Sequence, residues 1–272
     1  MKLGCSTVLF NQLDLYGALQ HISWAGYEGA ELACLAHYAR HVELITKKPY
    51  IDEIKATAKK HNLGLFAIHA GTGDQPGLDR VPAMKIMFEV ASKLGIPIVT
   101  IRCKGKSDDK EATKEEFKII REMSKAAESF GVTMAMKPHV GASVYNTATL
   151  IQMLNEIDSP GLGANLDTLH IYRAREDGAQ TVRKLGKKLV HVHLREYPDV
   201  EDRQGYEAIA EEEIAGRGGV EFPKILQALK SIGYTGAMDL DVIGAFTFPL
   251  SRQMGITAES RGYFNRCLQE LK

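Results

Sequence analysis

The chain has 272 residues, of which 44% are hydrophobic and 25% charged, and its 34 basic side chains balance 34 acidic ones. This is the balance of an ordinary soluble globular protein. With no surplus of basic charge, duplex nucleic acid is not an expected partner. No apolar run reaches 18 residues, so we expect no membrane span, and the N-terminus has no apolar signal segment. We therefore expect a cytoplasmic protein.

Short apolar runs alternate with longer amphipathic runs along the whole chain. The predicted buried strands are 3–6, 29–34, 64–69, 97–102, 132–137, 162–167, 189–194 and 236–241. The predicted helices are 14–25, 48–61, 81–94, 110–130, 147–156, 175–186, 221–232 and 258–271. No stretch resembles a linker, so residues 1–272 are expected to form a single domain.

Eight strand–helix units predict an α/β protein with a parallel sheet closed into a single (β/α)8 TIM barrel. The competing fold is an open, doubly wound sheet, which should carry a glycine-rich phosphate turn after its first strand. The residues at 5–10 read CSTVLF and contain no such turn. The barrel is therefore the favoured fold, with its active site at the C-terminal ends of the strands.

Polar side chains gather where the predicted strands end. Since alternate residues of a strand share a face, His191 and His193 point the same way, as do Asp239 and Asp241. The other polar residues at these ends are Glu31, His69, Arg102, Lys104, Lys137, His139, Asp167, His170, Arg195 and Glu196. One converging site explains them better than separate structural roles do. Asp167, His193 and Asp241 together would suit a divalent metal.

Five segments give the chain a family resemblance. They are AGYEGAEL at 25–32, GVTMAMKPH at 131–139, LDTLH at 166–170, HVHLRE at 191–196 and GYTG at 233–236. In these segments the chain resembles the xylose isomerase-like barrel family of sugar isomerases, epimerases and related lyases. The resemblance implies a divalent metal, Mn²⁺ first, with Co²⁺, Mg²⁺ or Zn²⁺ as alternatives, and it implies a homo-oligomer.

The family's usual ligands are Glu, Asp, His and Glu on four successive strands. By this resemblance Asp167 and His193 are metal ligands, Asp241 replaces the last glutamate, and His170 lies near the substrate. Lys137 stands where the first glutamate is expected. Lys137 could neutralise Asp167 and Asp241 in place of a metal, stabilise an enolate beside one, or act as a base or amine nucleophile. It could also be only an ion-pair partner.

Several cations are expected at the barrel mouth. Arg102, Lys104 and Arg195, together with Lys137, would make this part of a neutral chain locally positive. Such a mouth favours a carboxylate or phosphate group on the substrate. The residues predicted to bind substrate are Glu31, His69, Arg102, His139 and Arg195.

Three functions are left open. The leading hypothesis is a metal-dependent isomerase or epimerase acting next to the carbonyl of a small sugar or anionic sugar derivative through an enediolate. Lys137, Asp241 and His170 would transfer protons. The second hypothesis is a lyase, either a keto-acid decarboxylase or a dehydratase. The third is a catalytically silent, metal-free sugar-binding or subunit-partner protein.

The long connection 197–217 is interpreted as a solvated loop or an active-site cover.

Overall fold

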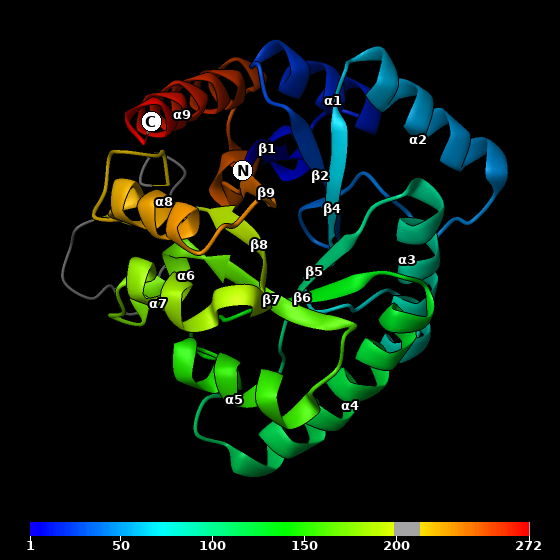
Figure 1. Ribbon diagram of the computed structural model, residues 1–272. Helices are drawn as coiled ribbons and strands as arrows, with labels where there is room; N and C mark the ends of the chain where they lie inside the picture. The colour runs from blue at the N-terminus through cyan, green and yellow to red at the C-terminus, as the bar shows by residue number, and fades with distance from the viewer. Residues whose placement is uncertain (199–212, 272) are drawn as a thin grey trace.

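The computed structural model describes residues 1–198 and 213–271 and shows a closed barrel of parallel strands surrounded by helices (Figure 1). The barrel strands are β1 (Lys2–Ser6), β2 (Gly29–Leu35), β4 (Gly64–His69), β5 (Ile98–Arg102), β6 (Thr133–Lys137), β7 (Leu162–Asp167), β8 (Leu189–Leu194) and β9 (Ala237–Leu240). β1 pairs in parallel with both β2 and β9, which closes the barrel. The predicted (β/α)8 barrel is confirmed.

Helices follow the strands in the expected order. They are α1 (Leu15–Trp24), α2 (Lys48–Lys60), α3 (Arg80–Leu94), α4 (Lys110–Ser129), α5 (Thr147–Ile157), α6 (Thr168–Arg173), α7 (Gly178–Leu185), α8 (Phe222–Ser231) and α9 (Leu250–Glu270). Short 3-10 helices span Thr7–Phe10, Gly186–Lys188 and Ile243–Thr247, and β3 (Ala39–Arg40) pairs antiparallel with β2. Among the described residues, no helix has the length and apolar character needed to cross a membrane.

Two helical boundaries differ from the sequence prediction. α9 begins at Leu250, eight residues before the predicted start, because Gln253, Ile256 and Thr257 are buried and packing outweighs the low helix propensity of Gly255. The predicted helix 175–186 shortens to α7, and the separate α6 precedes it. Asp167 ends β7 and also caps α6, because its carboxylate accepts a hydrogen bond from the His170 N–H.

Two register shifts occur next to polar residues that face the barrel interior. One lies between Ala30 and Glu31 in β2, and the other between Ala164 and Asn165 in β7. Bulges of this kind re-aim side chains near active sites. Here the side chains of Glu31 and Asn165, which directly follow the two shifts, are fully buried in the interior.

Candidate active site

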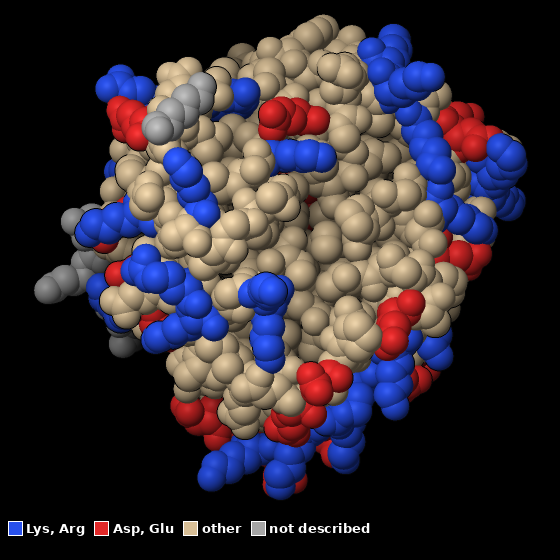
Figure 2. Space-filling model, viewed as in Figure 1, with Lys and Arg blue, Asp and Glu red and all other residues tan. Residues whose placement is uncertain are grey.

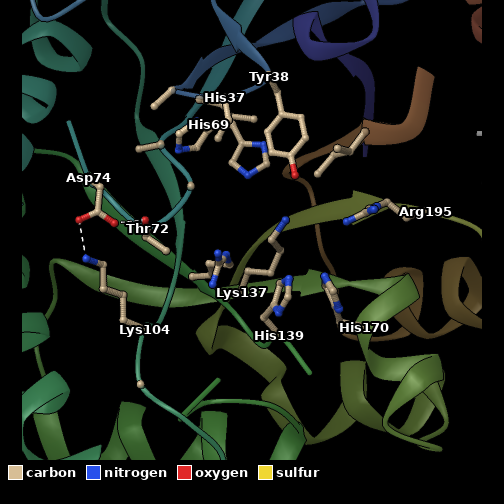
Figure 3. A pocket seen from close by; sticks show the side chains of 17 residues that line it. His37, Tyr38, His69, Thr72, Asp74, Lys104, Lys137, His139, His170 and Arg195 are labelled. Atoms are coloured by element: carbon tan, nitrogen blue, oxygen red, sulfur yellow. Dashed lines mark hydrogen bonds and ion pairs between the residues drawn. The ribbon is translucent and has the colours of Figure 1, made fainter. Parts of the chain in front are cut away.

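A cavity of about 510 Å³ opens at the C-terminal ends of the strands (Figure 3). Six of the residues predicted from sequence line it: His69, Arg102, Lys137, His139, His170 and Arg195. The other four predicted residues, Glu31, Asp167, His193 and Asp241, are fully buried beneath it. The barrel thus brings the whole predicted set to one end of the molecule.

Lys137 is the last residue of β6, and its ammonium lies among the three predicted metal ligands. Its Nζ lies 3.2 Å from Asp167 Oδ2, 3.5 Å from His193 Nδ1 and 3.8 Å from Asp241 Oδ2. The side chain is almost fully buried. A cation therefore already lies between the two carboxylates that the sequence assigns to a metal.

Glu31 and His193 form the central ion pair of the interior. His193 Nε2 lies 2.9 Å from Glu31 Oε1, which also accepts a 2.8 Å hydrogen bond from the Thr100 hydroxyl. Burial alone would lower the pKa of His193, but Glu31, Asp167 and Asp241 outweigh it and raise that pKa to about 9. His193 is thus held as an imidazolium below that pH.

A second pair lies next to this one. His191 Nε2 lies 3.2 Å from Asp239 Oδ2 and 3.8 Å from Glu31 Oε1. Burial raises the pKa of Asp239, although His191 opposes that shift. Because His191 also lies near Glu31, this pair and the Glu31–His193 pair form one continuous buried cluster of ionisable side chains inside the barrel.

The rings of His139 and His170 pack against each other with centroids 4.0 Å apart and an interplanar angle of 41°. Burial lowers the pKa of His139 to about 3, with Arg102 and Lys137 adding to the effect. Burial also holds the pKa of His170 well below its usual range, despite the nearby Asp167. Both rings are therefore neutral near pH 7, and His170 Nδ1 has no hydrogen-bond partner among the described residues. A neutral ring facing the cavity can accept a proton.

Arg195 is anchored by acidic side chains. Its guanidinium lies 3.5 Å from Asp167 Oδ2 and 3.1 Å from Glu213 Oε1. The Thr168 hydroxyl accepts a hydrogen bond from the main-chain N–H of Arg195 and donates one to the main-chain carbonyl of Arg195. The guanidinium is thus fixed at the wall of the cavity.

The interior contains a donor set suited to a divalent metal. Two groups of described residues have ligand atoms within 4.8 Å of one another: Glu31, His191 and His193 in one, and His69, His193 and Asp241 in the other. Both oxygens of Asp241 and Nδ1 of His69 are buried without a hydrogen-bond partner among the described residues. Carboxylate and imidazole ligands fit Zn²⁺ or Mn²⁺. His193 and Asp241 are shared with the sequence-based set, whereas Asp167 instead faces Lys137 and Arg195.

Sequence reasoning missed the polar residues that support the site. Thr100 and Asn165 contact Glu31 and His193, and neither received a role. The available signal was alternation, because Thr100 lies two residues before Arg102 and Asn165 two before Asp167. In the connection 197–217, residues 199–212 lie outside the described residues, so its interpretation as a cover stays a prediction.

Comparisons with known proteins show that the chain is similar to proteins named as epimerases, isomerases and dehydratases. It is 25% identical to a D-psicose 3-epimerase of Enterocloster bolteae over 80% of this chain and 73% of that protein. It is 22% identical to an inosose dehydratase of Lacticaseibacillus casei, over 80% of this chain and 78% of the relative. The expectation of an enzyme of the isomerase, epimerase or related lyase type agrees with these relatives.

A solved structure of the IOLI protein with a zinc atom has the same fold. Its TM-score against this chain is 0.77, at 18% identity and 96% coverage of each chain. The sequence pattern described as the xylose isomerase-like TIM barrel matches residues 19–264. That match covers most of the barrel and all ten predicted site residues, and the chain belongs to the xylose isomerase-like TIM barrel family.

Proposed function

We propose that this protein is an isomerase or epimerase acting next to the carbonyl of a small sugar or anionic sugar derivative through an enediolate. The observation that carries the proposal is the position of Lys137 above Asp167, His193 and Asp241 at the floor of the cavity. Cations close to a reacting carbonyl stabilise the negative charge that develops when a neighbouring carbon loses its proton.

Three residues would move protons. The Lys137 ammonium would donate a hydrogen bond to the enediolate oxygen, and Asp241, whose carboxylate oxygens lack hydrogen bonds among the described residues, would accept the carbon-bound proton. His170, a neutral imidazole that lines the cavity, would move a proton between the hydroxyl and carbonyl oxygens. Glu31 would act through His193, whose ring it orients.

A divalent ion, Mn²⁺ by preference, would be held by His193 and Asp241 with either Asp167 or His69 as the third ligand. When bound it would supply a Lewis acid that polarises the substrate carbonyl. The Lys137 ammonium lies within 4 Å of all three sequence-predicted ligands, so it and the ion compete for the same negative charge.

A lyase reaction on the same site is the second candidate, favoured by the cationic side chains around the cavity and by the dehydratase among the relatives. Isomerisation and dehydration both begin with removal of a proton next to a carbonyl, and a dehydratase then loses water from the resulting enolate. A keto-acid decarboxylase instead forms its enolate by loss of carbon dioxide and then takes up a proton. The third candidate, a silent sugar-binding protein, predicts no proton removal at all.

One experiment separates the three. The purified protein is incubated in ²H₂O with a panel of ketoses, inososes and sugar acids, with Mn²⁺ and with a chelator in parallel. Deuterium entering the carbon next to the carbonyl, with interconversion of isomers, supports the proposal. Loss of water or carbon dioxide supports the lyase. Specific binding without deuterium incorporation, with or without metal, would favour the silent protein and refute the proposed reaction.

We also propose a cytoplasmic homo-oligomer, as the sequence and the family resemblance predict. Sedimentation velocity tests the oligomer directly, and a single monomeric species at micromolar concentration would refute it. Fractionation of the native cell tests the location.

A further inference from the structure

Among the described residues, four lysine and arginine side chains line the cavity, and three of them are already paired with carboxylates. Lys137 lies within 4 Å of Asp167 and Asp241. Arg195 lies within 4 Å of Asp167 and Glu213. At the outer edge, Lys104 forms an ion pair with Asp74, as the dashed line in Figure 3 marks.

Arg102 is the exception. Its main-chain N–H donates to the carbonyl of Gly71, but its guanidinium has no hydrogen bond or ion pair with any residue in the described ranges 1–198 and 213–271. The side chain is half-buried at the end of β5. Burial lowers the pKa of this arginine, which is the expected effect of partial removal from water.

The strand register directs Arg102 toward the reacting end of the site. Arg102 is the register partner of Lys137 on the neighbouring strand β6, so both side chains leave the sheet on the same face. Adjacent strands lie about 4.8 Å apart. Arg102 also acts electrostatically on His139, whose pKa it helps to lower. A small molecule of a few carbons could therefore contact Arg102 at one end and Lys137 at the other.

The acidic side chain that acts electrostatically on Arg102 does not pair with it. Asp74 influences its pKa, but the Asp74 carboxylate is held by Lys104 and by the Thr72 hydroxyl. A guanidinium presents a planar pair of donors that matches a carboxylate or a phosphate. A partly desolvated arginine with no such partner leaves a strong binding position for one.

We infer that Arg102 binds a terminal oxyanion of the substrate, so that the natural substrate is a sugar acid or a sugar phosphate rather than a neutral sugar. This inference rests on the proposed function for the identity of the reacting site, and it adds the chemical class of the substrate. The carboxylate or phosphate lies at Arg102 while the carbonyl end faces Lys137 and His170.

The test uses two matched pairs of ligands that differ only in the anionic group. D-Gluconate is compared with D-glucitol, and D-ribulose 5-phosphate with D-ribulose, by calorimetry on the full chain at 20 mM and 200 mM salt. We expect one anionic member to bind at least tenfold more tightly than its neutral partner, with the preference reduced at high salt. The pair that shows the preference identifies the group as a carboxylate or a phosphate.

Two variants assign the preference to one side chain. Arg102→Gln should reduce the anion-to-neutral ratio to about one, whereas Lys104→Gln, which removes the cation already held by Asp74, should retain most of it. Circular dichroism spectra verify that both variants are folded. Equal affinity for both members of both pairs in the wild type, including no binding of any ligand, overturns the inference. A preference that survives Arg102→Gln also overturns it.

The outcomes for the reaction and for the anion position are separable. If D-ribulose exchanges deuterium and the phosphate adds no affinity, the proposed function stands and the role of Arg102 is refuted. If an anion binds through Arg102 but no ligand of the panel exchanges deuterium, the anion position stands and the proposed reaction is refuted.

Discussion

Carboxylates are paired with basic side chains both at the floor and at the rim of the cavity, but the floor is buried and the rim is exposed to solvent. The floor cluster, which we define as Glu31, His191, His193 and Asp239, is fully buried. The rim pair, Lys104 and Asp74, keeps 46% and 48% of its side-chain surface exposed. An exposed pair contributes about 0–1 kcal/mol, whereas unpairing a buried one costs about 3–5 kcal/mol. Loss of an ion pair should therefore change the free energy of unfolding little at the rim and much more at the floor.

The interior below the cavity also contains buried polar atoms that form no hydrogen bond with any described residue. These atoms include both carboxylate oxygens of Asp239 and both of Asp241. Such atoms are rare in native interiors and need an explanation. Because the Asp241 carboxylate lies within 4 Å of both Lys137 and His193, reactivity is expected from this part of the site, whereas we assign selection of the substrate to Arg102 nearer the rim. Figure 2 shows basic and acidic side chains intermixed around the periphery of one face, with no broad surface of one charge. An anionic substrate would therefore be recognised by individual side chains in the cavity.

The largest expected effect comes from removing the cation above the floor. Lys137→Ala should lower kcat by about 10²–10⁴-fold, because it removes the group placed to stabilise and protonate the enediolate. It should also lower the free energy of unfolding by about 3–5 kcal/mol, since the buried Asp167 and Asp241 lose a partner. Steady-state kinetics on the substrate found by deuterium exchange, together with urea denaturation, measure the two effects.

The rim supplies the control for this change. Lys104→Ala removes an ion pair of similar composition but half exposed, and should change the free energy of unfolding by less than about 1 kcal/mol. Lys137→Met, which keeps the length and apolar stem, separates charge from packing. Should Lys137→Met retain near wild-type kcat while losing stability, Lys137 is only an ion-pair partner and its catalytic role is refuted.

The next effect concerns the glycine that makes room for the floor cluster. A Cβ on Gly4 would lie 1.9 Å from Asp239 Oδ1 and 2.8 Å from a ring carbon of Phe66. Gly4→Ala should therefore displace Asp239 from His191 and lower the free energy of unfolding by about 1–3 kcal/mol. Gly255→Ala in the exposed part of α9, where the added Cβ meets nothing within 4 Å, should instead be neutral or stabilising by up to about 1 kcal/mol. Equal effects of the two changes would contradict this account.

Much of the barrel could be predicted from sequence because its strands are short apolar runs with polar residues at their ends. The predicted strand 64–69 coincides with β4, and 162–167 and 189–194 with β7 and β8. Alternation within strands correctly placed His191 and His193 on one face. It could not show that Asp239 pairs with His191, because that contact depends on the register between the neighbouring strands β8 and β9. Nor could it reveal the register shift beside Glu31, which leaves no local sequence signal.

A smaller effect is expected from the neutral histidine pair, His139 and His170, that lines the cavity. The pKa of His139 is lowered to about 3 in the folded protein, so the unfolded chain binds a proton first as the pH falls. The stability linked to this residue is fully present above pH 6.5 and is lost as the pH falls toward 3. At pH 5 the loss is about 2 kcal/mol, taking 1.36 kcal/mol per pKa unit.

His139→Gln removes this titration. Urea denaturation at pH 7.5 and pH 5 should show a smaller acid destabilisation for the variant than for the wild type, by about 2 kcal/mol. An unchanged difference between the two pH values would mean that the ring is protonated equally in the folded and unfolded states.

The smallest expected effect concerns the affinity of the site for Mn²⁺, and it tests the proposed metal ligands directly. Lys137→Glu replaces the ammonium that lies 3.2 Å from Asp167 and 3.5 Å from His193 with a carboxylate, where the family resemblance expects a ligand. A carboxylate attracts a divalent ion whereas an ammonium repels it, so Mn²⁺ should bind at least tenfold more tightly. Calorimetry with Mn²⁺ alone measures this without reference to activity. Lys137→Gln, which removes the positive charge without adding a carboxylate, should give an intermediate affinity. Unchanged or weaker Mn²⁺ binding in Lys137→Glu would mean that Lys137 does not occupy a ligand position, and the assignment of His193 and Asp241 as metal ligands would fall with it.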